Sequence, residues 1–373
     1  MLQKTIAVFA LLASWGVSAQ GASYSTAFLN PFGGKQSAAY AINDQGVVIG
    51  RATLDNNVNE HGFVWANGVA VSVGTLGGPH SYAYGLNNAS TVVGHSFRMD
   101  TFGGAFRWEA GTLQNLDPDP ASTGWHFSQA HDINEAGAIV GSVSNHLQFP
   151  FARNQAVLLR AGVTTVLAPS AGEDSWATAI NDNNVAVGYS SGYVATLWQG
   201  GLASSWEPKS LMSLGFGSTM AHDINNAGLI VGESRTSFGY SVAVTWQGEQ
   251  IIRLQGLTEG NASAYAVNES GQVVGYSSIA HTGGRAVLWQ DGEVTDLNLR
   301  LSESERASGW TLTVARDINE SGWIVGEAFN SKLGLNSAFV MSVIPAVPEP
   351  STSLMLFAGV GLLGLAAARK QRS

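Results

Sequence analysis

Three aspartates at equivalent places in a repeated pattern are the first residues whose chemistry is worth testing. Asp132, Asp223 and Asp317 each stand two residues before an asparagine that recurs along the chain. If the strand that carries this position is the innermost of each repeat unit, the carboxylates converge toward the axis and could hold a hard cation through oxygen ligands. The alternative is that each accepts backbone hydrogen bonds or pairs with a cation such as Arg316. They remain weak metal candidates, and no metal or other cofactor is assigned.

Two long connections between strands combine tryptophan with acidic side chains, which suits sugar binding. An indole face stacks on a sugar ring while carboxylates accept its hydroxyl hydrogen bonds. The candidate ligand-binding residues are Trp125, Trp310, Asp117, Asp119, Glu303 and Glu305. Both tryptophans stand nine residues before a recurring asparagine. That fixed spacing makes a structural wedge the alternative interpretation.

Catalytic chemistry has little support, and no catalytic residue is assigned. The chain lacks the zinc motif His-Glu-x-x-His and the P-loop pattern, and its eight histidines are scattered. A glycosidase needs two carboxylates flanking one sugar bond at a defined separation, and sequence spacing does not supply that. The chain is therefore predicted not to be an enzyme, with a polysaccharide hydrolase or lyase as the alternative.

The elements that would position these residues belong to a repeat of about 45 residues. Its pattern is Ala-x-x-Ile-Asn-x-x-Gly-x-Val-Val-Gly, and it occurs seven times. The anchor asparagines are Asn43, Asn87, Asn134, Asn181, Asn225, Asn268 and Asn319, followed seven residues later by Gly50, Gly94, Gly141, Gly188, Gly232, Gly275 and Gly326. A position that admits only glycine indicates that another backbone comes close. Asn-x-x-Gly is typical of a type I turn closed by a left-handed residue, so it predicts a hairpin corner.

Each repeat contains four short apolar stretches separated by turn residues, which predicts four antiparallel strands. Seven such units predict an all-β, seven-bladed β-propeller, with a stacked solenoid as the alternative. The first fragment, residues 24–34, matches the end of a repeat, and the seventh repeat lacks its final strand. The N-terminal strand is therefore predicted to pair with the last blade and close the ring.

One position varies while its neighbours do not. Three residues before the anchor, the seven repeats carry Tyr40, Tyr84, His131, Thr178, His222, Tyr265 and Arg316. This variation indicates a surface or channel where the blades differ. The alternative is that these polar side chains fill gaps between blades with satisfied hydrogen bonds.

Composition excludes several classes of function. The chain has 45 glycines, 12% charged residues and no cysteine, so neither disulfides nor thiol chemistry can operate. Its formal net charge of −9 argues against nucleic-acid binding, because phosphate backbones would be repelled.

Both ends of the chain read as targeting segments. Residues 1–22 combine a basic start, an apolar core and a small-residue cleavage site, which predicts a secretory signal peptide. The repeat domain is assigned to residues 23–344 and a C-terminal segment to residues 345–373. Its apolar run, residues 354–368, spans about 22 Å as a helix, a marginal length for a permanent membrane anchor. An ordinary tail anchor is the alternative.

The C-terminal segment resembles the PEP-CTERM sorting signal. The residues that carry the resemblance are Val347, Pro348, Glu349 and Pro350 before the apolar run, and Arg369, Lys370 and Arg372 behind it. The resemblance implies a Gram-negative envelope protein that is processed by an exosortase-type enzyme and held transiently in the inner membrane. It also implies sorting to the cell surface or extracellular matrix in a biofilm setting.

The repeats resemble the extracellular HAF-repeat family through their anchor pattern followed by Ala-Phe-x-Trp. The tripeptide behind the family name is kept only approximately, as in His61-Gly62-Phe63. No catalytic motif comes with this resemblance. The sequence therefore predicts a non-catalytic surface or matrix protein that binds exopolysaccharide or partner proteins, and a purely structural matrix protein is a further alternative.

Overall fold

The computed structural model describes residues 23–99, 103–117, 127–144, 153–200, 206–215, 217–279 and 283–344. Residues Tyr24–Val343 form one compact unit. The predicted signal peptide (residues 1–22) and sorting segment (residues 345–373) lie outside the described residues. Strands make up 61% of the structure and helices 3%, so the prediction of an all-β protein is confirmed.

Five separate four-stranded antiparallel sheets correspond to repeat units 2 to 6. Units 2 and 3 consist of β6 (Ser81–Leu86), β7 (Val92–Ser96), β8 (Gly104–Glu109), β9 (Thr112–Asn115), β10 (Phe127–Ile133), β11 (Ile139–Ser144), β12 (Asn154–Arg160) and β13 (Val163–Leu167). Units 4 to 6 consist of β14 (Ser175–Ile180), β15 (Val185–Ser190), β16 (Val194–Gln199), β17 (Glu207–Ser210), β18 (Thr219–Ile224), β19 (Leu229–Arg235), β20 (Ser241–Gln247), β21 (Gln250–Arg253), β22 (Ala262–Val267), β23 (Val273–Ile279), β24 (Gly283–Gln290) and β25 (Glu293–Asp296).

The remaining eight strands form units 1 and 7, which are joined in one sheet. Unit 1 consists of β2 (Gly33–Ile42), β3 (Val48–Leu54), β4 (Glu60–Ala66) and β5 (Val69–Ser72), and unit 7 of β26 (Trp310–Ile318), β27 (Ile324–Asn330), β28 (Leu335–Ile344) and β1 (Ser23–Leu29). A single parallel pair, Gln36 opposite Asn336, joins the two units. Because β1 pairs with β28, the first strand of the compact unit completes the sheet built by its last three.

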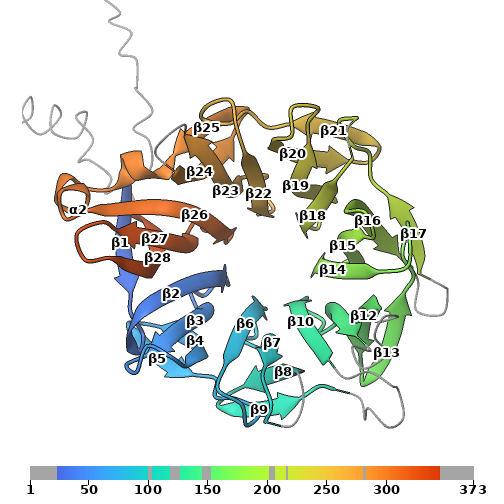
Figure 1. Ribbon diagram of the computed structural model, residues 1–373, viewed down its shortest axis with the longest axis horizontal. Helices are drawn as coiled ribbons and strands as arrows, with labels where there is room; N and C mark the ends of the chain where they lie inside the picture. Colours follow the sequence, from blue (N-terminus) through green and yellow to red (C-terminus); the bar gives the residue numbers. More distant parts are fainter. Residues whose placement is uncertain are drawn as a thin grey trace, which may run out of the picture. The chain divides into compact units, whose positions relative to one another are not determined.

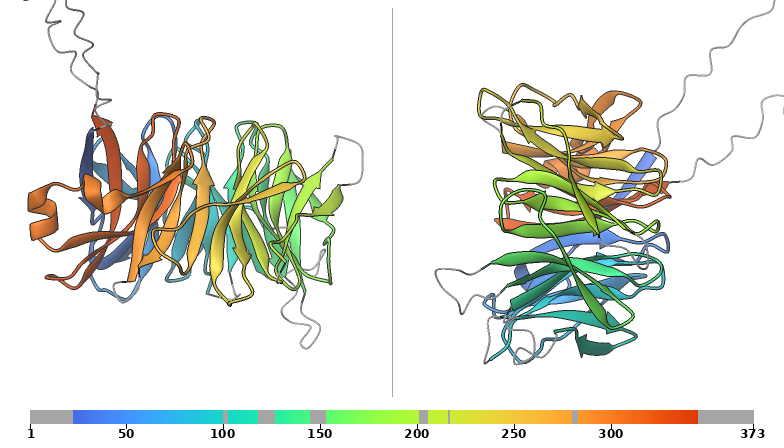
Figure 2. Two further views of the ribbon diagram at one scale, coloured as in Figure 1. Left: turned by 90° about the horizontal axis from the view of Figure 1, so that it is seen from above. Right: turned by 90° about the vertical axis from the view of Figure 1, so that its right-hand side faces the viewer.

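Figure 1 shows the repeat units arranged in a ring, with the first strand of each unit nearest the centre. The strands cross the thickness of the ring, so the hairpin turns gather on its two faces (Figure 2). The innermost strands are β2, β6, β10, β14, β18, β22 and β26. The Ala-x-x-Ile-Asn stretch therefore lies innermost in each unit, which was the condition for the three aspartates to converge.

The repeat glycines are required because the neighbouring strand leaves no room for a side chain. A Cβ atom on Gly188 would overlap the carbonyl oxygen of Trp176 and lie 2.9 Å from the Cα atom of Ala177. The other six glycines meet the carbonyl oxygen of the equivalent residue in their own units. The prediction of close backbone approach is thus confirmed at every copy.

The Asn-x-x-Gly segments form hairpin turns, as predicted. In unit 1 the amide of Gly46 donates to the carbonyl of Asn43, and Gly46 has φ +76°. Ser90 and Asn184 replace the glycine in units 2 and 4 and keep positive φ values of 60° and 57°. Left-handed residues therefore close all seven turns, although asparagine and serine tolerate that conformation less readily than glycine.

The anchor asparagines link each unit to the next by a closed cycle of hydrogen bonds. Each is at most 6% exposed, and its side-chain Nδ2 donates to the main-chain carbonyl of the following anchor. The cycle closes where Asn319 donates to the carbonyl of Asn43 at 2.9 Å. Their Oδ1 atoms accept the amide of the residue four positions later, as Asn181 does from Val185 at 2.9 Å. The anchor therefore fixes both its own turn and the junction between units.

The hydrophobic core lies between neighbouring sheets. Val187 and Ala195 of unit 4 pack with Ala221, Val244 and Trp246 of unit 5 in one buried cluster. The indole N–H of a buried tryptophan reaches back to the preceding unit, as Trp246 does to the carbonyl of Met212 at 2.7 Å. Fully burying a side chain of this size stabilises the fold by about 2 to 3 kcal/mol. Every sheet is thus stabilised by contact with its neighbours.

The connection from unit 6 to unit 7 differs from the prediction, which placed no helix there. It contains the 3₁₀-helix η2 (Leu297–Arg300) and the five-residue helix α2 (Glu303–Ala307), at the outer edge of the ring in Figure 1. The Ser302 hydroxyl oxygen accepts a hydrogen bond from the Glu305 amide, and Glu305 Oε2 accepts one from the Ser302 amide. The two bonds form a capping box. The Ser-x-x-Glu spacing was the sequence signal for this helix, and the periodicity search missed it because the helix is so short.

Candidate functional site

The variable position three residues before each anchor, called here the bulge position, lines one pocket at the centre of the ring. The pocket has a volume of about 160 Å³ and is open to solvent. Its lining includes Tyr40, Tyr84, His131, Thr178, His222, Tyr265 and Arg316, one side chain from each unit. The side chains therefore face one shared space, as the first interpretation states, while His131 and Thr178 also hydrogen-bond to the next unit, as the alternative states. This central pocket is the candidate functional site.

A β-bulge places each of these side chains in the pocket. In unit 3, Ala130 lies opposite Gly141 and Asp132 lies opposite Val140, so His131 has no partner across the pair. The register shifts at the same place in the other six units. A bulge inserts one extra residue and redirects its side chain. The sequence showed the variation at this position but gave no sign of the bulge.

The three aspartates that follow the bulge also line the central pocket, and each joins two units. Asp132 accepts the amide of Ile133 at 2.8 Å and, from the next unit, the amide of Ile180 at 2.8 Å. Asp223 and Asp317 make the equivalent pairs of hydrogen bonds, which join units 5 to 6 and 7 to 1. The alternative of backbone hydrogen bonding therefore describes these carboxylates.

Burial sets the protonation of the three carboxyl groups. Loss of solvent raises the pKa of Asp132 and of Asp317 to about 6 and that of Asp223 to about 7. The backbone hydrogen bonds oppose this rise in pKa, and the charges of Asp317 and Asp132 add to it at Asp223. The three carboxyl groups therefore release their protons at a pH closer to neutral than an exposed aspartate does.

The two histidines of the pocket are held neutral by the same burial. Loss of solvent lowers the pKa of His131, and it lowers that of His222 to about 4 with help from the positive charge of Arg316. His131 Nδ1 lies 2.7 Å from the carbonyl oxygen of Ala177 in the next unit. His222 Nε2 is buried, and no described residue is its hydrogen-bond partner. A buried polar atom of this kind is normally satisfied by water or a ligand.

Aromatic rings and one cation complete the wall. The ring of Tyr84 lies 5.7 Å from that of Tyr40 and 6.0 Å from that of His131. Elsewhere in the wall, the guanidinium carbon of Arg316 lies 4.8 Å from the centre of the Tyr265 ring, in a cation–π contact. Arg316 also donates from Nε and Nη2 to one oxygen of Glu327, at 2.9 and 2.7 Å. The positive charge in the pocket is therefore largely balanced by its own partner.

A second closed cycle of hydrogen bonds, which the sequence did not lead us to predict, links the Asn-x-x-Gly turns of the seven units. The residue after each anchor donates its amide to a side-chain oxygen of the equivalent residue in the next unit, at 2.8 to 3.0 Å. The seven residues are Asp44, Asn88, Glu135, Asp182, Asn226, Glu269 and Glu320. The signal was present in the sequence, since only Asp, Asn or Glu occurs at this position. Its regular bonding gives it a structural role.

The metal hypothesis for the three aspartates gains no support from the geometry. Among the described residues, no group of three or more His, Cys, Asp or Glu side chains lies close enough to hold a metal ion. The aspartates converge on one pocket, as the sequence suggested, but their oxygens are directed to backbone amides. The pocket wall is a mixed surface of carboxylates, tyrosines and neutral histidines.

The tryptophan candidates are only partly described. Trp310 begins β26 and stacks on Phe28 of β1, with ring centroids 3.8 Å apart and planes 6° from parallel. It also borders a surface pocket with Lys35 and Asn336. Glu303 and Glu305 lie on α2, where Glu305 serves the capping box. The packing of Trp310 against the closing strand agrees with the wedge interpretation and does not test sugar binding.

Of the second loop, only Asp117 can be placed, because Trp125 and Asp119 lie outside the described residues. Asp117 pairs with Arg98 and accepts the amide of Ala105 at 3.2 Å. Burial raises its pKa to about 6, although Arg98 opposes the rise. Sugar binding at the two loops remains a prediction.

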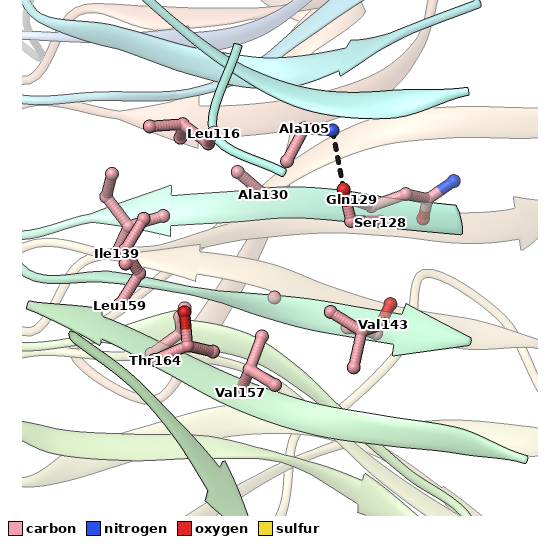
Figure 3. Close-up of a pocket in the computed structure, with 13 residues that line it drawn as sticks. Ala105, Leu116, Ser128, Gln129, Ala130, Ile139, Val143, Val157, Leu159 and Thr164 are labelled. Atoms are coloured by element: carbon pink, nitrogen blue, oxygen red, sulfur yellow. Dashed lines mark hydrogen bonds between the residues drawn. The ribbon is translucent and has the colours of Figure 1, made fainter. Parts of the chain in front are cut away.

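Another cavity, of about 30 Å³, lies between units 2 and 3 and is lined mainly by apolar side chains (Figure 3). Leu116, Ile139 and Val157 border it, and the amide of Ala105 donates to Ser128 Oγ at 2.7 Å across the junction. Converging polar side chains, which would orient a ligand, are scarce here. This cavity is therefore a packing gap between sheets.

Two motif matches that the sequence reading overlooked do not alter the catalytic assignment. Residues 188–192 read Gly-Tyr-Ser-Ser-Gly, but Ser190 ends strand β15, is fully buried and lies 3.0 Å from the Thr196 hydroxyl. A nucleophile elbow needs an exposed serine between a strand and a helix. Residues 359–364 read Gly-Val-Gly-Leu-Leu-Gly and lie outside the described residues.

Comparison with protein families identifies the C-terminal segment. Residues 346–371 match the family model of the PEP-CTERM protein-sorting motif. This signal marks an exported protein that passes the membrane to the cell surface and is a substrate of an exosortase. No curated protein matches the chain. Among the described residues, no helix has the length and apolar character needed to cross a membrane.

Solved structures show only distant similarity. TolB from Acinetobacter baumannii has a TM-score of 0.45 and 11% identity, over 78% of this chain and 67% of that one. Dipeptidyl peptidase 4 from Porphyromonas gingivalis has a TM-score of 0.41 and 11% identity, over 80% of this chain and 51% of that one. A triple mutant of AofleA from Arthrobotrys oligospora has a TM-score of 0.39 and 10% identity, over 85% and 86%. The chain matches about half the length of the dipeptidyl peptidase, and similarity at these TM-scores carries no functional argument.

Proposed function

We propose that residues 23–344 form a seven-bladed β-propeller of HAF-type repeats that binds an extracellular ligand in its central pocket without changing it chemically. The ligand class proposed is exopolysaccharide, with a partner protein of the cell surface as the alternative. The single observation that carries the proposal is that a variable position of the repeat, three residues before the anchor, lines one pocket in all seven units and supplies it with tyrosine, histidine, threonine and arginine side chains.

Export fits this role. The sorting motif at residues 346–371 directs the protein to the surface, where it would meet polymer outside the cell. In the proposal, residues 1–22 are removed as a signal peptide. The apolar run at residues 354–368 holds the protein in the inner membrane until the exosortase acts. Release into a biofilm matrix then places the central pocket next to its ligand.

The pocket chemistry supports binding of a polyhydroxylated ligand. Tyrosine rings offer flat apolar faces, while carboxylates, hydroxyl groups and His222 Nε2 offer hydrogen bonds. The alternative of a polysaccharide hydrolase or lyase draws on the raised pKa of Asp223, which at about 7 would suit an acid catalyst.

The test is incubation of residues 20–345 with the exopolysaccharide of the producing bacterium, following co-sedimentation and polymer chain length together. The matched variants are Tyr84→Ser in the pocket and Tyr240→Ser, whose side chain is exposed in a turn outside it. We expect saturable co-sedimentation, unchanged chain length, at least tenfold weaker binding in Tyr84→Ser and no change in Tyr240→Ser.

Each other outcome contradicts a defined part of the proposal. Shortening of the polymer, lost in Asp223→Asn, would establish an enzyme. Equal binding by the Tyr84→Ser and Tyr240→Ser variants would show that the polymer binds outside the central pocket. No saturable binding to the polymer would remove the exopolysaccharide role and leave a structural or protein-partner function.

A further inference from the structure

The charged groups that face the central pocket leave it with an excess of negative charge. From the seven inner strands, the ionisable groups are Tyr40, Tyr84, His131, Asp132, His222, Asp223, Tyr265, Arg316 and Asp317. Both histidines are neutral at pH 7, because burial lowers their pKa. Arg316 is the one cation in this set, and Glu327 neutralises it at 2.7 Å. Three carboxylates therefore remain without a positive partner.

These carboxylates retain the capacity to accept further hydrogen bonds. Each carboxylate oxygen of Asp132, Asp223 and Asp317 accepts one hydrogen bond from a backbone amide. An ionised carboxylate has about four lone-pair sites, so about two remain on each aspartate. The side chains border the pocket and are only partly buried, so a ligand can reach them. Burial is the main cause of the raised pKa of Asp223, and the charges of Asp317 and Asp132 add to it, so a positive charge placed near these groups would be stabilised.

The remaining wall suits an organic cation better than a metal ion. The described carboxylates and histidines do not gather into a coordination group, so a small bare ion would find too few ligands. An ammonium group does not need such a coordination shell, because one charge-assisted hydrogen bond to a carboxylate holds it while water or hydroxyl groups accept its other two N–H bonds. The rings of Tyr40, Tyr84 and Tyr265 provide faces for a sugar ring and for cation–π contact, and His222 Nε2 provides a buried hydrogen-bonding atom.

We propose that the central pocket binds a protonated primary amine carried on a hydroxylated ring, that is, an amino sugar with a free amine. This inference rests on the proposed function and narrows its ligand class. Three carboxylates select the ammonium group, and the tyrosines and His222 select the ring. A neutral sugar would leave the carboxylates without a counter-charge, and an acidic sugar would be repelled.

The experiment is calorimetric titration of residues 20–345 at pH 7.5 with D-glucosamine, N-acetyl-D-glucosamine, D-glucose and putrescine. We expect D-glucosamine to bind at least tenfold more tightly than each of the other three. Asp223→Asn and Asp132→Asn should each weaken D-glucosamine at least tenfold. Asp291→Asn, an exposed turn residue outside the pocket, should leave its affinity unchanged. Two pocket variants are used so that misfolding of one, seen by circular dichroism, does not decide the result.

The other outcomes separate this inference from the proposed function. Equal affinity for D-glucosamine and N-acetyl-D-glucosamine, or no binding of either, would overturn the amine selectivity, while polymer co-sedimentation still decides the function. Putrescine binding as tightly as D-glucosamine would overturn the requirement for a sugar ring. Affinity should fall as the pH drops from 7.5 to 5, because the carboxyl groups become protonated, and an unchanged affinity would contradict their role.

Discussion

The anchor position and the bulge position lie three residues apart in every unit, yet they behave in opposite ways. The anchor is asparagine in all seven units and closes a cycle of hydrogen bonds from Asn43 round to Asn319. The bulge position holds tyrosine, histidine, threonine or arginine and lines the central pocket. Constancy therefore marks the positions that join the sheets. Variation marks the positions that face a space where the repeats can differ.

The difference has a physical basis. An anchor side chain is at most 6% exposed and serves both its own turn and the next unit, so any replacement leaves buried partners unsatisfied. A bulge side chain stands out of the strand pairing, so different residues fit without breaking the sheet. Ring stability and ligand recognition are thereby assigned to separate residues of one short segment.

The largest expected effect comes from filling the space at a repeat glycine. Gly188→Ala places a Cβ atom against the carbonyl oxygen of Trp176, so the strands must separate. We expect the free energy of unfolding in urea to fall by about 3 to 5 kcal/mol. The control is Gly228→Ala, a turn glycine with φ +77° and no atom within 4 Å of the new Cβ, which should cost about 1 kcal/mol. Equal losses in the two variants would refute close packing at Gly188.

The second prediction compares the two positions directly within unit 4. Asn181→Ala removes the hydrogen bond to the carbonyl of Asn225 at 3.0 Å and the one from the amide of Val185 at 2.9 Å. We expect a loss of about 2 to 4 kcal/mol of unfolding free energy. Thr178→Ala at the bulge position, which loses a 2.9 Å hydrogen bond to the carbonyl of Ala221, should cost about 1 kcal/mol. A larger loss in Thr178→Ala would reverse the assignment of stability to the anchors.

The smallest expected effect is a pH dependence that belongs to the pocket. The pKa of Asp223 is raised from 3.8 to about 7, so the folded protein binds this proton more tightly than the unfolded chain. Its contribution to stability is full below pH 4 and is lost as the pH rises through 7. When the pH falls from 8 to 5, the free energy of unfolding of the wild type should therefore rise by on the order of 2 kcal/mol more than that of Asp223→Asn. Urea unfolding at both pH values measures this gain, and a constant difference would refute the raised pKa. Comparing with the variant cancels the opposing protonation of His131 and His222.

The sequence predicted those parts of the structure that repeat. Seven copies of one pattern located the anchors, the hairpin turns, the glycine contacts and the pairing of β1 with β28, because each imposes a residue type at a fixed spacing. The convergence of the aspartates also followed from their shared position. Their bonds to Ile180, Val267 and Ile42 did not, because these depend on how two sheets face each other.

The candidate site was only half visible in the sequence. The bulge leaves no residue signature, so the variable position could be seen without knowing where its side chain points. The tryptophan loops attracted attention through composition alone. Stacking of Trp310 on Phe28 depends on the closing strand, which lies almost 300 residues away in the chain.

The most direct test of the account is a crystal structure of residues 20–345 bound to oligosaccharides released from the exopolysaccharide. The account predicts electron density for a sugar in the central pocket, in contact with Tyr84, His222 and the Asp223 carboxylate. Sugar density beside Trp310 at the outer edge, with the central pocket empty, would contradict the claim that the variable positions form the binding site.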